Sequence, residues 1–192
     1  SYAVAHSLSE GSDCTDMIIN PAFTDASGKG WTFEKNDNVT ATNPRGGLEQ
    51  FYCAEAYGGW DSNAGFLFDV HQEINEVPDG LYSISVNCFY RPGDNGQFDG
   101  TEEVPAVIYM NDFQTPVQHI AKEAIADITD MESCGKLLSA TSWVETEGIG
   151  FVPNSMDAAS QAFALDMYKQ TVYGLVQGGK MRIGIKKETK TD

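Results

Sequence analysis

Apolar and polar residues alternate most regularly between residues 80 and 91. Tyr82, Ile84, Val86, Cys88 and Tyr90 fall on one side of an extended chain, and Ser83, Ser85, Asn87 and Arg91 fall on the other. A period of two is typical of a strand that buries one face, and the preceding Pro78-Asp79-Gly80 is typical of a turn. The sequence therefore predicts a central strand with an apolar inner face. Its polar face is either open to solvent or the floor of a site for a polar ligand.

Shorter strand-like runs precede and follow this strand. They are expected at residues 16–19, 31–33, 39–42, 48–57, 65–74 and 104–111, and in a C-terminal hairpin of 171–177 and 180–187 around Gly178-Gly179. A helix is expected from Thr115-Pro116 through Ile128, where a capping box precedes an apolar stripe. A second helix is expected from Asn154 or Ser155 through Phe163, with Asn154 as a capping residue. This pattern predicts an all-β fold with short helical insertions, an antiparallel two-sheet β-sandwich of jelly-roll type.

The length and charge of the chain limit what it binds. At 192 residues it suits one domain, with residues 1–15 as a linker or lead-in and residues 16–192 as a single sandwich domain. The 12 basic and 28 acidic residues give a net charge of −16, which disfavours nucleic acid and anionic membranes as partners. No run approaches the ~18 apolar residues of a membrane-spanning helix, so no membrane insertion is predicted.

The cysteines and the N-terminus say less. Cys14, Cys53, Cys88 and Cys134 lie far apart without a C-x-x-C spacing, so neither a zinc motif nor a redox motif is indicated. An even number permits two disulfides, but the spacing does not assign them. The first ten residues carry no export pattern and no initiating methionine, which indicates a piece of a longer protein.

Three stretches, taken together and in this order, carry a resemblance to a known family. They are Ile19–Phe23 with Gly30-Trp31; Phe68–Gln72 with Pro78–Tyr82, Phe89–Arg91 and Tyr109–Asn111; and Val152–Met156 with Lys180–Lys186. The set resembles the galactose-binding-like, carbohydrate-binding-module-like jelly-roll domains of secreted and surface proteins of Bacteroidetes, over about residues 17 to 187.

This resemblance implies a jelly-roll fold and a location outside the cytoplasm, whether secreted, periplasmic or on the cell surface. It also implies glycan binding beside other domains of a longer parent chain. Family members typically add a strand after the segment that matches Ile183-Gly184-Ile185. If that strand is absent here, one sheet edge or core slot stays open.

Candidate ligand-binding residues concentrate in the glycine-rich stretch from Tyr57 to Asn63. Aromatic rings pack against the C–H faces of sugars, small polar side chains bond their hydroxyls, and loops on a rigid sandwich often carry function. The predicted ligand-binding residues are Trp60, Tyr57, Arg91, Tyr90, Asp61 and Asn63. Trp60 has a structural alternative as a lid on the core, and Arg91 has one as a member of an internal ion pair.

A structural calcium ion is the one cofactor considered. Asp94, Asp99 and Glu102 offer oxygen ligands in a short acidic loop, although Gly96 stands where the EF-hand pattern requires Asp or Asn. A solvated acidic loop is the favoured interpretation of this stretch.

No enzymatic activity is predicted for this domain. The sequence has no P-loop, G-x-S-x-G or H-E-x-x-H motif, and its three histidines are scattered. An enzyme would require two carboxylates facing each other across a cleft, which the sequence cannot place. The predicted function is a non-catalytic carbohydrate-binding module of a larger secreted or surface protein. Its partners would be a polysaccharide or oligosaccharide and neighbouring domains of the same chain. The alternative is a structural or protein-interaction spacer domain without sugar binding.

Overall fold

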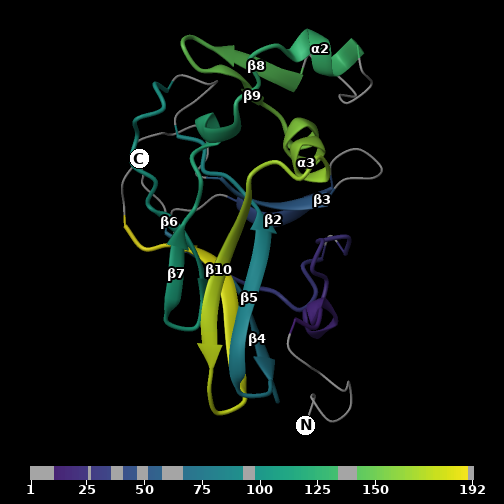
Figure 1. Cartoon of the computed structure of the whole chain (residues 1–192), viewed down its shortest axis with the longest axis vertical. Coiled ribbons are helices and arrows are strands. Elements are labelled where there is room, and N and C mark those ends of the chain that lie inside the picture. The colour runs from purple at the N-terminus through teal and green to yellow at the C-terminus, as the bar shows by residue number, and fades with distance from the viewer. Residues whose placement is uncertain are drawn as a thin grey trace.

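The computed structural model describes residues 11–25, 27–35, 41–46, 52–57, 67–92, 98–133 and 142–189, and these form an all-β antiparallel sandwich (Figure 1). The larger sheet has five strands in the order β1 (Thr32–Lys35), β4 (Phe68–Asn75), β11 (Lys180–Lys187), β6 (Ala106–Met110) and β7 (Phe113–Pro116). The facing layer is a ribbon of β5 (Gly80–Asn87) and β10 (Lys169–Val176). The predicted fold class is therefore confirmed, whereas the jelly-roll order of strands stays a prediction.

Two strand pairs and four short helices complete the described structure. Strands β2 (Ala41–Gly46) and β3 (Tyr52–Tyr57) pair with each other, as do β8 (Trp143–Thr146) and β9 (Gly150–Pro153). The helices are η1 (Thr15–Met17), η2 (Ile120–Glu123), α2 (Ile128–Ser133) and α3 (Met156–Ala164). In Figure 1, α2, α3 and the β8–β9 pair lie together above the sandwich.

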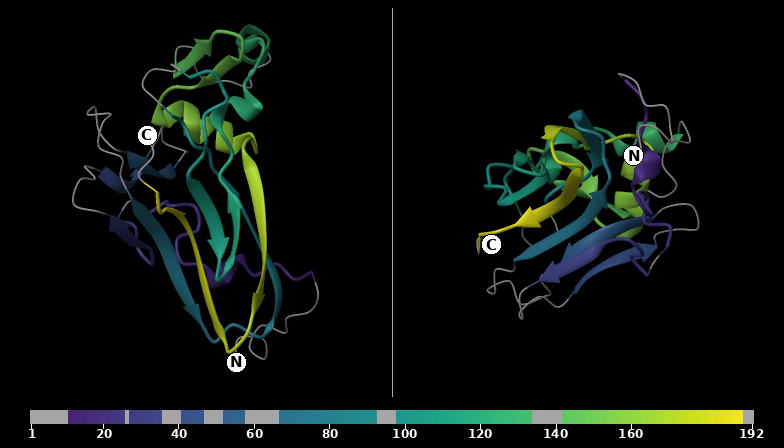
Figure 2. Two further views of the ribbon diagram at one scale, coloured as in Figure 1. Left: turned by 90° about the vertical axis from the view of Figure 1, so that its left-hand side faces the viewer. Right: turned by 90° about the horizontal axis from the view of Figure 1, so that it is seen from below.

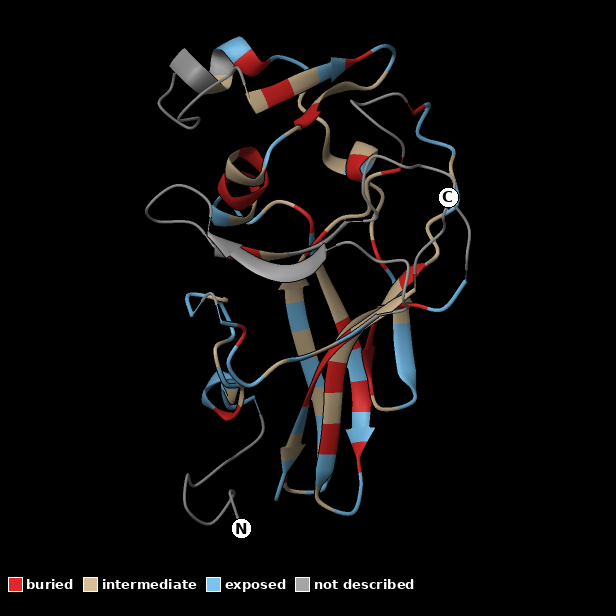
Figure 3. Ribbon diagram, turned by 180° about the vertical axis from the view of Figure 1, so that it is seen from behind, coloured by how far each residue is buried: buried red, intermediate tan, exposed pale blue. Residues whose placement is uncertain are grey.

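The predicted central strand is β5, and its alternation behaves as expected. Tyr82, Ile84 and Val86 pack against the core between the two layers, whereas Ser83 and Ser85 are exposed. The opposite wall of this core comes from alternate residues of β4, β6 and β11. Figure 3 shows the alternation as stripes of buried and exposed positions along the strands.

The C-terminal strands exist as predicted, but they do not form a hairpin. Strand β10 pairs with β5, and β11 lies between β4 and β6 in the other sheet. The apolar residues of β10 and β11 face each other across the core, so Gly178-Gly179 crosses between layers. The turn from β4 to β5 makes the same crossing beside it, and Val77 N donates to Gly179 O at 3.1 Å. Figure 2 shows both turns at the lower end of the sandwich.

The helix predicted from Thr115 to Ile128 is wrong. Residues Phe113–Pro116 form the edge strand β7. Proline has no N–H to donate, but an edge strand tolerates this because one of its sides has no partner strand. The apolar residues that suggested a helix lie in separate elements instead: Ile120 is buried in the turn η2, Ile125 forms a bridge to Phe151, and Ile128 is buried at the start of α2. Pairing with distant strands has overridden the local helical pattern.

The short strand predicted at residues 16–19 is also wrong, because η1 occupies part of this stretch. The backbone of Ile19 bonds to the side chain of Gln72 and not to the backbone of another strand. Its N–H donates to Gln72 Oε1 at 2.8 Å, and Gln72 Nε2 donates back to Ile19 O at 2.9 Å. The buried amide of Gln72 therefore holds the N-terminal segment against β4.

The second predicted helix is confirmed as α3, but its cap is Ser155 and not Asn154. Ser155 Oγ accepts a hydrogen bond from Ala158 N at 3.0 Å. Asn154 instead accepts a hydrogen bond from Arg91. The helix packs its alanines into a second apolar cluster, which also contains Phe98, Ile120, Trp143, Val152 and Tyr168. The part of the chain that the structure describes includes no helix long and apolar enough to cross a membrane.

The three described cysteines, Cys14, Cys53 and Cys88, form no disulfide with one another, and their environments differ. Burial raises the pKa of the Cys88 thiol to about 12, against a smaller lowering by a hydrogen bond from Gln170. Cys14 is only half-buried. The thiolate is the reactive form of cysteine, so both ionisation and access disfavour reaction at Cys88.

Iodoacetamide should therefore alkylate Cys14 of the native protein well before Cys88. Peptide mapping by mass spectrometry after timed exposure would measure both rates, with the urea-unfolded protein as the control in which the two converge. Equal native rates would contradict the burial of Cys88 against the core.

Candidate functional site

Most of the aromatic loop predicted to bind ligand lies outside the described residues. Tyr57 ends β3, but its side chain lies outside the described residues, as do Trp60, Asp61 and Asn63 entirely. Ligand binding by this loop stays a prediction.

Tyr90 and Arg91 make contacts within the protein. Tyr90 packs against the core between the layers, and the Lys187 ammonium lies 5.8 Å from the centroid of its ring. Arg91 Nη2 donates a hydrogen bond to Asn154 Oδ1, which joins the end of the central strand to the segment before α3. These contacts account for both residues structurally, and their ligand-binding role stays a prediction.

In the loop proposed for calcium, the described carboxylates accept hydrogen bonds from groups of the same loop. Asp99 Oδ1 accepts hydrogen bonds from the hydroxyl and the N–H of Thr101, which together lower the pKa of Asp99. The two oxygens of Glu102 accept from the N–H groups of Asp99 and Gly100 at 2.9 Å each. Asp94 lies outside the described residues, so a calcium site here stays a prediction.

A polar network covers part of the larger sheet on the side turned away from the core. This outer-face network consists of Asp69, His71 and Glu73 on β4, Tyr109 on β6 and Arg182 on β11. Tyr109 Oη donates to Asp69 Oδ1 at 2.7 Å, and Arg182 Nη2 donates to Asp69 Oδ2 at 3.0 Å. Burial and the bond to Asp69 raise the pKa of the Tyr109 hydroxyl. The network therefore joins three neighbouring strands through one carboxylate.

One corner of this network resembles a metal site by composition. A carboxylate oxygen of Glu34, one of Asp69 and a ring nitrogen of His71 lie within 4.8 Å of one another. Glu34 stands directly opposite Asp69 in the register of β1 and β4, and like charges in such a pair repel. A cation between them would offset this repulsion.

Two members of this group, Asp69 and His71, are already bound by a cation, Arg182 of the neighbouring strand β11. A guanidinium group only donates hydrogen bonds, so His71 Nδ1, 3.1 Å from Arg182 Nη2, accepts with its lone pair. A neutral imidazole in this arrangement carries its proton on Nε2, which leaves no ring nitrogen free to bind a metal. The 3.4 Å approach of Nδ1 to Asp69 Oδ1 is then a contact without a proton between the two atoms. A metal would have to displace Arg182.

Adding Zn²⁺ should leave the thermal unfolding midpoint of the wild-type protein unchanged. In Arg182→Ala, His71 and Asp69 lose their guanidinium partner, and Zn²⁺ should raise the midpoint because a ligand that binds only the folded state stabilises it. The Arg182→Ala/His71→Ala double variant is the control and should not respond. A rise in the wild-type protein that His71→Ala removes would show a metal site instead.

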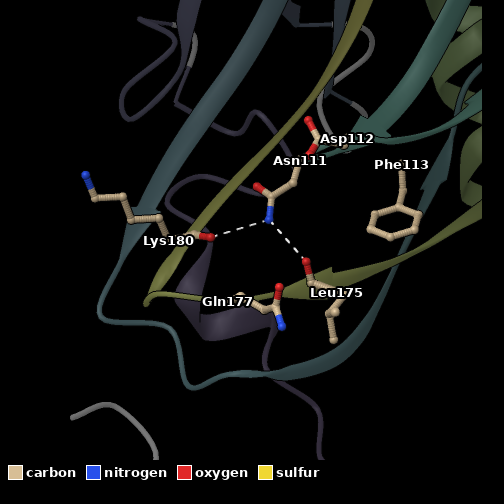
Figure 4. A pocket seen from close by; sticks show the side chains of 6 residues that line it. All are labelled: Asn111, Asp112, Phe113, Leu175, Gln177 and Lys180. Atoms are coloured by element: carbon tan, nitrogen blue, oxygen red, sulfur yellow. Dashed lines mark hydrogen bonds between the residues drawn. The ribbon is translucent and has the colours of Figure 1, made fainter.

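A separate concave site lies near the lower end of the sandwich, where the β6–β7 turn meets β10 and the turn after it (Figure 4). This pocket has a volume of about 460 Å³ and is lined by Asn111, Asp112, Phe113, Leu175, Gln177 and Lys180. Asn111, Asp112 and Gln177 contribute amide and carboxylate groups beside the apolar side chains of Phe113 and Leu175, whereas the ammonium of Lys180 points away from them (Figure 4). Phe113 is 46% exposed and Leu175 is 42% exposed, so both remain open to a ligand.

Asn111 holds the strands that form the pocket together through hydrogen bonds to their backbone. It takes a positive φ of 51° in the two-residue turn between β6 and β7, a conformation that asparagine tolerates better than most residues. Its Oδ1 accepts from Arg182 N at 2.9 Å, and its Nδ2 donates to Leu175 O and Lys180 O at 3.4 Å each. The last two bonds are the dashed lines of Figure 4. One side chain thus fixes β6, β10 and β11 relative to one another.

The pocket opens beside apolar side chains that point to solvent. Tyr173 and Leu175 lie on the outer face of β10, Leu81 lies opposite Leu175 on β5, and Phe113 comes from β7, which packs next to β10. Tyr173 is 65% exposed and Leu81 is 76% exposed. We call these four residues the apolar strip. Contiguous exposed apolar side chains of this kind mark binding surfaces more often than chance.

Comparison with known proteins gives no family. The chain matches no family model, no curated protein and no solved structure. The resemblance to galactose-binding-like domains therefore stays a prediction, and function has to be argued from the pocket and its surroundings.

Sequence reasoning missed the pocket and the apolar strip. Asn111-Asp112 after an apolar run is a signal for a two-residue hairpin turn, but the capping-box pattern that follows it suggested a helix. Tyr173 and Leu175 alternate with Val172, Gly174 and Val176, which predicts a strand with apolar residues on both faces. That unusual outer face was the available signal for a binding surface.

Proposed function

We propose that this chain is a non-catalytic carbohydrate-binding module whose ligand binds at the pocket of Figure 4. The observation that carries the proposal is the exposed Phe113 ring, together with Leu175 in the same pocket, beside amide and carboxylate groups. Apolar side chains pack against the C–H faces of a sugar ring, and the polar groups bond its hydroxyls. Ligand sites in general combine an apolar lining with a few polar groups that fix orientation.

The residues of the pocket divide into two roles. Phe113 and Leu175 provide the apolar surface, and the side chains of Asp112 and Gln177 supply groups that can bond hydroxyls. Asn111 is a positioning residue, because its amide is already engaged by the backbone of β10 and β11.

The pocket supports binding and not hydrolysis. Glycoside hydrolysis requires a pair of carboxyl groups about 5 to 10 Å apart on either side of the bond to be cleaved. Among the described lining residues the pocket holds one carboxylate, Asp112. We propose, as the family resemblance implies, that the domain belongs to a longer extracytoplasmic protein, with a polysaccharide or oligosaccharide as ligand and catalytic activity, if any, in neighbouring domains.

Isothermal titration calorimetry against plant, host and microbial polysaccharides tests the proposal. Phe113→Ala should weaken binding about tenfold or more, as expected for a central aromatic contact. Leu165→Ala removes an exposed apolar side chain directly after α3 and is the matched control, which should bind as wild type does. Thermal unfolding of each variant shows that the fold is retained.

Two outcomes would contradict this placement. Binding that Trp60→Ala abolishes and Phe113→Ala leaves intact would assign the site to the predicted aromatic loop. No binding to any polysaccharide would favour the alternative function, a structural or protein-interaction spacer whose apolar strip contacts another protein.

A further inference from the structure

The outer face of the β5–β10 ribbon is unusual for a chain of net charge −16. In Figure 1 this ribbon lies in front of the larger sheet, so its outer face is turned to the viewer. Three consecutive cross-strand pairs on it carry no charged group: Leu81 with Leu175, Ser83 with Tyr173, and Ser85 with Thr171. The solvent-facing side of an antiparallel sheet normally carries polar and charged side chains, and here apolar side chains and hydroxyls stand in their place.

We propose that the ligand surface continues from the pocket along this ribbon and takes a neutral, linear oligosaccharide chain. A single terminal sugar would not use this surface. The inference rests on the proposed function, because it extends the same site. It names the class of ligand: an unbranched stretch of several uncharged sugar units.

The length of the uncharged face supports a chain. Leu175 and Thr171 are four residues apart on β10, and a strand rises by about 3.4 Å per residue, so they span about 14 Å. The pocket adds further length beyond Leu175. This distance exceeds one sugar ring. We call the surface formed by these three cross-strand pairs the uncharged strip, which is longer than the apolar strip beside the pocket.

The side chains along the uncharged strip suit a sugar chain, which presents both C–H faces and hydroxyl groups. Tyr173 and Leu81 offer exposed apolar surface, and the hydroxyls of Ser85 and Thr171 lie 2.8 Å apart at the far end. Hydroxyl groups both donate and accept, so this pair can exchange its mutual bond for bonds to a sugar.

The charges at the two ends explain why the chain should be neutral. At the far end Lys169 pairs with Asp166 at 3.2 Å, and Asn87 Nδ2 also donates to Asp166 at 3.3 Å, so that cation is already partnered. At the near end the side chain of Lys180 points away from Phe113 and Leu175 (Figure 4). The uncharged strip between them offers no cation to a uronate or sulfate group, and the net charge of the protein repels polyanions.

A length series tests the inference. Calorimetry would measure the affinity for neutral linear oligosaccharides of one to six units, taken from β-1,4-linked glucan, mannan and xylan. Affinity should rise about tenfold or more between the shortest and the longest ligand of the preferred series, since each added contact lowers the dissociation constant. Oligogalacturonides of matched length, which are anionic, should bind more weakly.

Variants at the far end separate the uncharged strip from the pocket. Thr171→Arg places a long charged side chain across the uncharged strip and should abolish the gain with length while leaving the affinity for the shortest bound ligand unchanged. Thr171→Val keeps the shape, loses the hydroxyl and should reduce the gain only in part. Thermal unfolding of both variants verifies the fold.

The outcomes distinguish this inference from the proposed function. Binding at the pocket that is independent of ligand length, or insensitive to Thr171→Arg, overturns the inference and leaves the pocket function standing. Tighter binding of oligogalacturonides overturns the neutral class. No binding to any sugar overturns both. Concentration-dependent self-association that Thr171→Arg abolishes, without length dependence, would make the uncharged strip a contact between copies of the chain.

Discussion

Replacing Gly184 with alanine should lower the free energy of unfolding by about 3 kcal/mol, the upper part of the range for overpacked cores. Gly184 lies in the middle of β11, between β4 and β6. An added Cβ would stand 2.5 Å from Val70 O, 2.9 Å from His71 Cβ and 3.0 Å from Tyr109 Cε1. The first atom belongs to the backbone of a paired strand and cannot move without disturbing the sheet.

The same substitution should also disturb the outer-face network, because an added Cβ would press against the side chains of Tyr109 and His71, which flank Gly184 on the neighbouring strands. Urea unfolding measures the loss. Gly80→Ala is the matched control: Gly80 begins β5, has an ordinary φ, and an added Cβ would meet Tyr82 at 3.7 Å, an unstrained contact. We expect that control to stay within about 0.5 kcal/mol of wild type. A similar small loss for Gly184→Ala would show that β11 can shift within the sheet.

Replacing Tyr168 with alanine should cost about 4 kcal/mol, as truncation of a fully buried aromatic residue does. Tyr168 is completely buried where the ribbon meets the helical end of the molecule. Its ring packs 4.9 Å from that of Phe89, and its hydroxyl donates to Ile120 O at 2.9 Å. The backbone carbonyl of Tyr168 accepts from Cys88 N, which ties it to the end of the central strand.

Tyr168→Phe separates packing from hydrogen bonding in this position. It keeps the ring and loses only the bond to Ile120 O, so it should cost about 1 kcal/mol. Urea unfolding of the two variants gives both numbers. If Tyr168→Phe were as damaging as Tyr168→Ala, the hydroxyl would dominate and the proposed packing between the second apolar cluster and β5 would be wrong.

Arg182 connects the outer-face network to the pocket. Its side chain binds Asp69, and its backbone N–H donates to Asn111, the residue that positions the pocket. The two polar surfaces therefore share one strand, β11, and one well-packed base. Such a base is what a binding site on a sandwich requires, because the lining side chains then keep their geometry without ligand.

Local patterns predicted several elements correctly. The alternation from Tyr82 to Val86 predicted β5 with its inner face, and the pattern after Asn154 or Ser155 predicted α3, although the cap is Ser155 and not Asn154. In both cases the deciding interactions lie within one element or on one face of it. Where the partner was distant, prediction failed: Thr115-Pro116 looked like a helix start and pairs with β6 instead.

The pocket was hidden for the same reason. Asn111 is 64 residues from Leu175 and 69 from Lys180 along the chain, and only the folding of β6, β10 and β11 brings them together. The predicted ligand residues Tyr90 and Arg91 are adjacent to a promising strand face, but their partners, Lys187 and Asn154, come from far along the chain. No spacing within the sequence announces such contacts.

The sequence by itself determined that this chain is an all-β protein with a central strand, because periodicity of two is set by neighbours along the backbone. It also determined the acidic charge and the absence of common catalytic motifs from the chain. Only the tertiary structure decided that β10 and β11 belong to opposite layers, that Arg182 takes the place of a cation beside Asp69 and His71, and that Phe113 and Leu175 share an exposed pocket. These features depend on which strands pair across long separations, and the free energy of that pairing comes from the whole core, which no local pattern encodes.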